Sequence, residues 1–168
     1  FVDSLYGVNA ILGDQENSRH GFLQPQEWHK SMKLLDIGSG WGFPGIPLKI
    51  VIPELEVTLL DSVGKKVKAM NHFVHELKLE NIGAIQERAE ILAKDPKHNG
   101  KYDFVVSRAT AYITDILKWS LPFLRPNGKI ILYKMPSEDE KKDIMKILKK
   151  LSLVNIWELS YELWWKKR

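Results

Sequence analysis

Short apolar runs alternate along the chain with longer segments in which apolar residues recur every three or four positions. The short runs have the length of buried strands, and the longer segments have the spacing of a helix with one buried face. This alternation predicts an α/β fold: a Rossmann-like, doubly wound, mostly parallel sheet with helices on both faces. The strands are expected at Met32–Ile37, Leu55–Leu60, Asn81–Gln86, Tyr102–Val106, Lys129–Tyr133 and Leu153–Tyr161.

Proline and serine mark the starts of two expected helices. Pro44 and Pro47 lie at the entry to a helix that ends near Ile52, because proline is tolerated in a first turn but not in a helix interior. Ser137 is placed to cap a basic helix. The buried faces of two further helices are expected to consist of Val67, Met70, Val74 and Leu77, and of Ile113, Ile116, Leu117 and Leu121.

A single domain over residues 1–168 accounts for this pattern. Of the 168 residues, 44% are hydrophobic and 27% are charged, which is ordinary for a globular domain with one substantial core. Ahead of the first strand we expect a helix over Phe1–Leu12 and a long polar loop over Asp14–Lys30. No apolar run approaches the roughly 20 residues needed to span a membrane.

Charge and composition exclude several kinds of site. The chain has no cysteine, which excludes disulfides, thiolate metal sites and cysteine nucleophiles. His72 and His75 are three positions apart but have no third ligand in a suitable position, so no metal site is expected. The formal net charge of +4 mildly favours an anionic partner.

The first expected strand leads into a glycine-rich turn, with the sequence LLDIGSGWGFPG over residues 34–45. Gly38, Gly40 and Gly42 let the backbone turn with positive φ and approach a ligand closely. The free N–H groups at the start of the following helix point into the same space. The turn is therefore predicted to be the first βα turn of a nucleotide-type binding sheet.

The spacing of this turn disfavours a dinucleotide. Phe43 stands where the dinucleotide fingerprint has its third glycine, and Asp36 would place a negative charge beside a phosphate. A ligand with a cationic amino end suits Asp36 better. The pattern D-x-G-x-G-x-G resembles motif I of methyltransferases that use S-adenosylmethionine (SAM). The alternative, a turn that binds nothing, does not account for the acid and the spaced glycines together.

Three further candidates lie where later strands end. Asp61 is placed to accept hydrogen bonds from a ribose, or else to cap the next helix. Glu90 can accept from the exocyclic amine of adenine, or serve as an acid at a helix start. Arg108 follows a strand that should neighbour the first one at the switch point of the sheet; its alternative role is a structural ion pair.

Longer stretches resemble one family. The segment LDIGSGWGFPGIPL over residues 35–48 looks like the signature of the bacterial 16S rRNA guanine-N7 methyltransferases called RsmG or GidB. LLDSVGKK over residues 59–66, HELKLEN over 75–81 and VSRA over 106–109 also resemble that family, as does Phe1–Leu5. The family's N-terminal helices are missing here, the loop over Asp14–Lys30 is longer, and no final strand is apparent after Tyr161.

This resemblance implies methyl transfer from SAM to N7 of a guanine in the 530 loop of 16S rRNA. It also implies that the protein acts in the cytoplasm with the small ribosomal subunit as its partner. No membrane partner and no bound metal are expected. The family's SAM contacts carry over to Gly38, Phe43, the Ala89–Glu90 pair and Arg108. With the acids and glycines above, the candidate cofactor-binding residues are Asp36, Gly38, Gly40, Phe43, Asp61, Ala89, Glu90 and Arg108.

Guanine N7 has a free lone pair and needs no deprotonation, so we name no catalytic residue. The candidates for ordering the nucleotide or its phosphate are Arg108 and Lys134. The candidates for stacking on a base are Trp41 and Tyr112, and the alternative for each is a place in the hydrophobic core. Alternatives are a methyltransferase for a small molecule or another RNA, a non-catalytic RNA-binding module, and an NAD(P)-binding oxidoreductase, which Phe43 and Asp36 disfavour.

Overall fold

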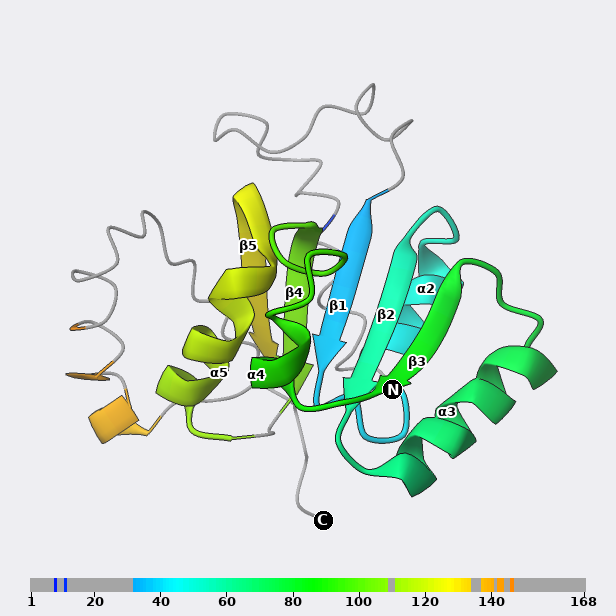
Figure 1. Ribbon diagram of the computed structural model, residues 1–168, viewed down its shortest axis with the longest axis horizontal. Helices are drawn as coiled ribbons and strands as arrows, with labels where there is room; N and C mark the ends of the chain where they lie inside the picture. Colours follow the sequence, from blue (N-terminus) through cyan, green and yellow to red (C-terminus); the bar gives the residue numbers. More distant parts are fainter. Residues whose placement is uncertain are drawn as a thin grey trace, which may run out of the picture.

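A computed structural model describes residues 8, 11, 32–108, 111–133, 137–140, 142–143 and 146. Five strands form one sheet in the order β3-β2-β1-β4-β5, and every neighbouring pair is parallel (Figure 1). The strands are β1 (Lys33–Ile37), β2 (Glu56–Asp61), β3 (Ile82–Gln86), β4 (Tyr102–Arg108) and β5 (Leu124–Tyr133). The strand order reverses between β1 and β4, so the chain leaves these two strands toward opposite faces of the sheet, and a ligand crevice is expected between their carboxyl ends. The predicted α/β architecture is confirmed.

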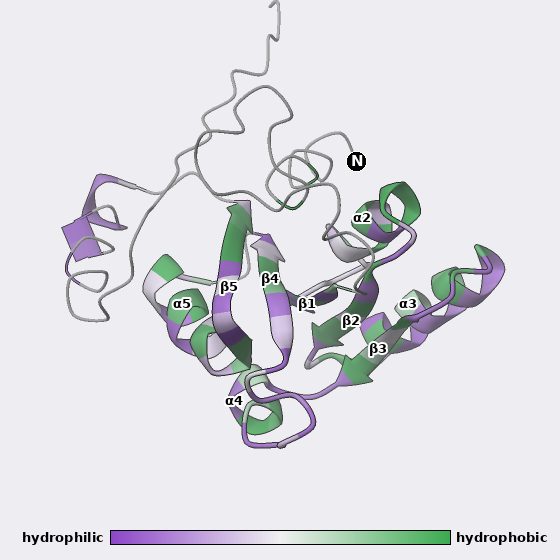
Figure 2. Ribbon diagram, turned by 90° about the horizontal axis from the view of Figure 1, so that it is seen from above, coloured by the Kyte–Doolittle hydropathy of each residue, from purple (hydrophilic) through white to green (hydrophobic). Residues whose placement is uncertain are grey.

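Helices cover both faces of the sheet (Figure 2). They are α2 (Gly45–Val51), α3 (Gly64–Glu76), α4 (Ala89–Leu92) and α5 (Ile113–Ser120), with a short 3-10 helix η2 at Leu121–Phe123. Successive residues of β1 supply the two cores: Leu34 packs with residues of α2 and α3, and Leu35 with residues of α4 and η2. This alternation follows from the pleat, which points neighbouring side chains to opposite faces.

The last two described strands are longer than the pattern predicts. β4 continues through Arg108, so Ser107 and Arg108 are held by the sheet instead of a loop. β5 begins at Leu124 and not at Lys129, so that Pro126, Asn127 and Gly128, which are typical of a turn, belong to the strand. A register shift between Tyr102 and Phe104 of β4 and a positive φ of 65° at Asn127 accommodate them. An irregularity of this kind absorbs turn-forming residues without ending the strand.

The expected buried face of α3 is correct except at its end. Val67 and Met70 are buried, but Leu77 is 52% exposed. The helix ends at Glu76, and Lys78 then adopts a positive φ of 51°. The chain reverses there, so that Leu79 packs against the core in place of Leu77.

The cap predicted at Ser137 is present as a reciprocal pair with Glu140. The Glu140 backbone N–H donates to Ser137 Oγ at 3.2 Å, and the Ser137 N–H donates to Glu140 Oε2 at 3.1 Å. The other Glu140 oxygen accepts from the backbone N–H of Ile113, at the start of α5. This capping box therefore joins the starts of two helices.

Some expectations fall on residues outside the described part of the chain: the loop over Asp14–Lys30, the strand over Leu153–Tyr161, and Lys134. Of the segment before β1, only Val8 and Ile11 are described below residue 32, and both are helical. Within the described residues, no helix has the length and apolar character required to cross a membrane.

Candidate functional site

The loop after β1 turns on three glycines with positive φ, as predicted. The φ angles of Gly38, Gly40 and Gly42 are 68°, 63° and 93°. The N–H groups of Gly38 and Ser39 both donate to the carbonyl of Leu60, at 2.8 and 3.0 Å, and so fix the loop to β2. A Cβ built on Gly40 would lie 4.0 Å from the Gly38 carbonyl oxygen, its nearest neighbour. The space beside Gly40 is therefore open to a ligand.

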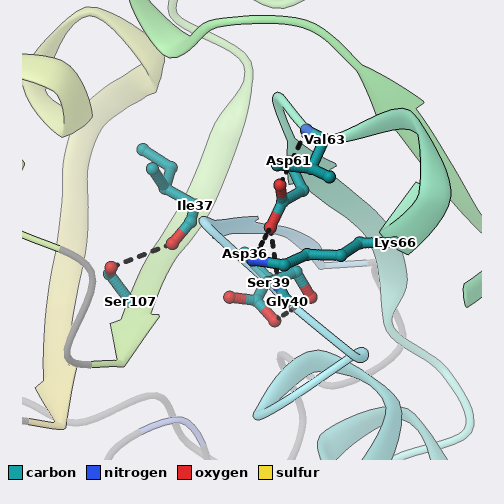
Figure 3. A network of polar contacts seen from close by, with 8 residues as sticks. All are labelled: Asp36, Ile37, Ser39, Gly40, Asp61, Val63, Lys66 and Ser107. Atoms are coloured by element: carbon teal, nitrogen blue, oxygen red, sulfur yellow. Dashed lines mark hydrogen bonds and ion pairs between the residues drawn. The ribbon is translucent and has the colours of Figure 1, made fainter.

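Asp36 lies beneath this loop and is completely buried. Its Oδ2 accepts a hydrogen bond from Ser39 Oγ at 2.6 Å (Figure 3). The same oxygen accepts a second hydrogen bond from the Gly45 N–H at 2.9 Å. Its Oδ1 is also buried and accepts no hydrogen bond from the described residues. Burial raises the pKa of Asp36 to about 6, although the Ser39 and Gly45 hydrogen bonds and the positive charge of Arg108 oppose the rise. Asp36 thus shapes the loop from below.

Gly45 is a site residue that the sequence reasoning missed. A Cβ on Gly45 would lie 2.4 Å from Leu59 Cδ2 and 2.9 Å from Asp36 Oδ2. The first turn of α2 can approach β2 and Asp36 this closely only because Gly45 has no side chain. This is the packing role of the third glycine in a dinucleotide fingerprint, moved two residues beyond Phe43. The available signal was the glycine between two prolines in the sequence PGIP.

Asp61, at the end of β2, joins the glycine loop to the start of α3. Its Oδ2 accepts from the Gly40 N–H at 3.0 Å and lies 3.6 Å from Lys66 Nζ, while its Oδ1 accepts from the Val63 N–H at 2.9 Å (Figure 3). Val63 is the N-cap residue of α3, and no side-chain cap bond is formed there. Asp61 is therefore not the cap itself, and its two oxygens retain acceptor capacity for a further donor.

Arg108 and Phe43 meet at the switch point. The Arg108 guanidinium carbon lies 5.4 Å from the centre of the Phe43 ring, within the range of a cation–π contact. The preceding Ser107 donates from Oγ to the Ile37 carbonyl at 2.9 Å, which ties β4 to the end of β1 (Figure 3). The arginine predicted from strand order is thus at the same end of the sheet as the glycine loop, and its charge acts on Asp36.

The Ala89–Glu90 pair forms the start of α4, with Ala89 buried and Glu90 exposed. Beside it, a cavity of about 300 Å³ opens at the carboxyl ends of β2 and β3. Ser62, Gln86, Glu87, Arg88 and Ile91 line this cavity. The sequence analysis identified the neighbouring acid Glu90 but missed Gln86. The Gln86 side chain lies against the start of α3, since a Cβ built on Gly64 would come 2.6 Å from Gln86 Oε1.

Two exposed aromatic residues flank the switch point. Trp41, in the glycine loop, is 51% exposed, and Tyr112, the residue before α5, is 41% exposed. The alternative that either belongs to the core is therefore wrong. His72 and His75 are exposed, and the described residues contain no group of three or more potential metal ligands.

The family model and the curated proteins that match this chain indicate the same family. The family model described as GidB, rRNA small subunit methyltransferase G, matches residues 22–162. Ribosomal RNA small subunit methyltransferase G of Lactococcus lactis is 38% identical over 133 residues, which cover 79% of this chain and 56% of that protein. The protein of the same name from Acetivibrio thermocellus is 43% identical over 146 residues, covering 84% of this chain and 60% of that protein.

Solved structures agree on the fold. A SAM-dependent methyltransferase from Aquifex aeolicus superposes with a TM-score of 0.55 at 20% identity, over 74% of each chain. Geranyl diphosphate methyltransferase in complex with GPP and sinefungin gives 0.58 at 15% identity, over 90% of this chain and 53% of that chain. The chain spans little more than half the length of the curated relatives named above, and it belongs to the rRNA small subunit methyltransferase G family, GidB.

Proposed function

We propose that this protein transfers a methyl group from SAM to N7 of a guanine in the rRNA of the small ribosomal subunit. One observation carries the proposal: in a chain of the GidB family, Asp61 fixes an open glycine loop at the switch point, beside Arg108. The guanine is the one in the 530 loop that the family resemblance implies, and the reaction takes place in the cytoplasm.

The residues around the loop fit SAM better than a dinucleotide. Asp36 and Asp61 place two carboxyl groups under and beside the glycines, where a pyrophosphate would meet repulsion. Asp61 has acceptor capacity for ribose hydroxyls, and Ala89–Glu90 with the adjoining cavity suit an adenine. The backbone of Gly38 and Gly40, together with Phe43 and Arg108, would hold the amino-acid end. When bound, SAM supplies a methyl group activated by its sulfonium.

The chain's own task in this reaction is to position the base. The N7 lone pair of a neutral guanine attacks without loss of a proton, so no general base is required. Proximity and orientation contribute up to roughly 7–11 kcal/mol in well-aligned cases. Trp41 and Tyr112 are exposed at the two loops of the switch point, where an unstacked base of single-stranded RNA needs an aromatic partner. Arg108 orders the SAM carboxylate or an RNA phosphate, with Lys134 as a second candidate.

The experiment that tests this proposal has a binding step and a reaction step. Calorimetry should give heat with SAM and S-adenosylhomocysteine but none with NAD. Incubation of the protein with SAM and unmodified small ribosomal subunits, followed by mass spectrometry, should then reveal a new methylguanine. Methylation of free metabolites alone would instead indicate a small-molecule methyltransferase, and RNA binding without SAM binding would indicate a non-catalytic module. Either result would overturn the proposal.

A further inference from the structure

A second cavity lies at the other end of the strands, where their amino-terminal residues lie. Its volume is about 320 Å³, and it is bounded by the first residues of β1, β2 and β3 and by the segment that leads into β4. The polar groups lining it include Lys33, Thr58, Lys97, His98, Lys101 and Tyr102. At about 3.3 Å per residue, the length of β1 separates this cavity from the glycine loop. It is therefore distinct from the methyl-transfer site.

Positive charge dominates the rim of this cavity. Lys33, Lys97 and Lys101 line it, and Glu56 is the one acidic residue among its described lining residues. Lys33 Nζ lies 2.8 Å from Glu56 Oε2, which neutralises that pair. Lys97 and Lys101 are both exposed and leave the rim with two positive charges in excess. The cavity therefore attracts an anion.

The inner wall of the cavity adds hydroxyl donors. The buried Tyr102 hydroxyl donates to Thr58 Oγ1 at 3.1 Å, and His98 Nδ1 lies 2.6 Å from the Tyr102 oxygen. Burial raises the pKa of Tyr102, and its hydrogen bond with Thr58 opposes the rise. The Tyr102 hydroxyl lies between His98 and Thr58, and the Thr58 hydroxyl can both donate and accept hydrogen bonds. Thr58 lines the cavity, so its hydroxyl is available to a phosphate oxygen there.

We propose that this cavity binds a phosphate group of the rRNA backbone. It thereby anchors the RNA at the amino-terminal ends of the strands, whereas the reacting guanine lies at their carboxyl ends. Lysine ammonium groups and a hydroxyl are typical partners of phosphate oxygens, and such contacts fix register without reading sequence. The inference rests on the proposed function for its choice of RNA as the phosphate source. Free inorganic phosphate is the competing source.

Gly83 provides a way to block the cavity. It lies in the lining, on β3, and a Cβ built there meets nothing within 4 Å. Gly83→Glu should therefore place a carboxylate in the cavity, whereas Gly83→Ala is the matched control. A second pair of variants leaves the sheet untouched. Lys97→Gln with Lys101→Gln removes the two excess charges, and Lys118→Gln with Lys142→Gln removes two exposed charges elsewhere, on α5 and beyond Ser137.

The measurement is the affinity for unmodified small-subunit rRNA at several salt concentrations, together with the affinity for SAM. Gly83→Glu should weaken RNA binding about tenfold or more, and the Lys97/Lys101 variant should lower the salt slope by about one. Both should bind SAM normally, and the two controls should resemble the unaltered protein. Equal RNA affinity and salt slope in test and control variants would overturn the inference.

A final comparison separates the two phosphate sources. Inorganic phosphate at millimolar concentration should compete with RNA in the unaltered protein but much less in the Lys97/Lys101 variant. Phosphate binding that depends on these lysines, with RNA affinity unchanged in their absence, would assign the cavity to free phosphate and overturn the RNA assignment. Failure of the proposed function looks different, because the unaltered protein would then not methylate rRNA at all.

Discussion

The carboxylate of Asp61 accepts a hydrogen bond from the backbone N–H of Gly40 at 3.0 Å, across the gap between the loops that follow β2 and β1. The same carboxylate holds the Val63 N–H at the start of α3. One acid thereby connects three parts of the site: the glycine loop, the end of β2 and the helix that follows it. Any ribose contact made by Asp61 comes in addition to this structural role.

Replacement of Asp61 should therefore weaken cofactor binding. Asp61→Ala removes the hydrogen bond to Gly40 and the charge-assisted hydrogen bond that we propose between Asp61 and the SAM ribose, and we expect a loss of about 1.5–3 kcal/mol in SAM binding free energy. Calorimetry with SAM measures it. Asp115→Ala, which removes a half-buried acid of α5, is the control. Unchanged SAM affinity together with reduced stability would mean that Asp61 is structural only.

Asp36 should make the stability of the protein depend on pH in a defined window. Its pKa is raised from 3.8 to about 6 by burial, so the folded protein holds this proton where the unfolded chain has lost it. The free energy of unfolding should therefore fall as the pH rises from about 4 to about 6 and should then level off, with a total change of up to about 3 kcal/mol from this group.

Asp36→Asn isolates this contribution. The amide oxygen can still accept from Ser39 and Gly45, but the side chain no longer titrates. Chemical denaturation of both proteins at a series of pH values should show a component of the pH dependence between about 4 and 6 that the variant lacks. Parallel curves for the two proteins would show that Asp36 does not titrate there.

The close approach at Gly45 should make that position intolerant of a methyl group. Gly45→Ala forces its Cβ against Leu59 and Asp36, and overpacking of this kind typically costs about 1–3 kcal/mol. Gly83→Ala, at an open position of β3, should change stability little. Thermal or denaturant unfolding compares the two variants. Equal stability would contradict the close packing of α2 on β2.

Trp41 should contribute to RNA binding but not to SAM binding. A base stacked on an aromatic side chain contributes about 1–3 kcal/mol, so Trp41→Ala should weaken binding of unmodified small-subunit rRNA by about that amount. Phe73→Ala removes another exposed aromatic residue, on α3, and serves as control. If both variants bind RNA as the unaltered protein does, Trp41 is not a stacking partner.

The order of the elements and the chemistry of the first loop were predictable because both depend on local pattern. Alternating apolar runs define buried strands, and glycines at alternate positions define a loop with positive φ. The depth of Asp36 and the contact between Gly45 and Leu59 were not predictable, because each depends on how closely α2 packs on the sheet. Leu77 was misplaced because the positive φ at Lys78 ends the helical period one residue earlier than the apolar spacing suggests.

The extension of β5 also lay outside what local signals could show. Pro126, Asn127 and Gly128 are turn-forming residues, yet they remain in a strand whose pairing with β4 is irregular. In the described part of the sheet β5 lies at the edge, where proline is tolerated since its missing N–H does not face a neighbour. The position of β5 at this edge therefore allows these turn-forming residues to belong to a strand.

The rate of methyl transfer to rRNA by the Arg108→Lys variant most directly tests the claim that the site at the switch point transfers the methyl group with the help of Arg108. Arg108 lies over Phe43 at the switch point, and lysine keeps the charge but not the planar fork that holds a carboxylate or phosphate with two hydrogen bonds. Initial rates of methyl incorporation into guanine N7 of unmodified small ribosomal subunits should fall by about tenfold or more at unchanged melting temperature, while Lys146→Ala, outside the site, retains most of its rate. Near-normal turnover in Arg108→Lys would contradict the placement of Arg108 against SAM or the RNA, and a lack of methyl incorporation by the unaltered protein would contradict the assignment of this site to methyl transfer.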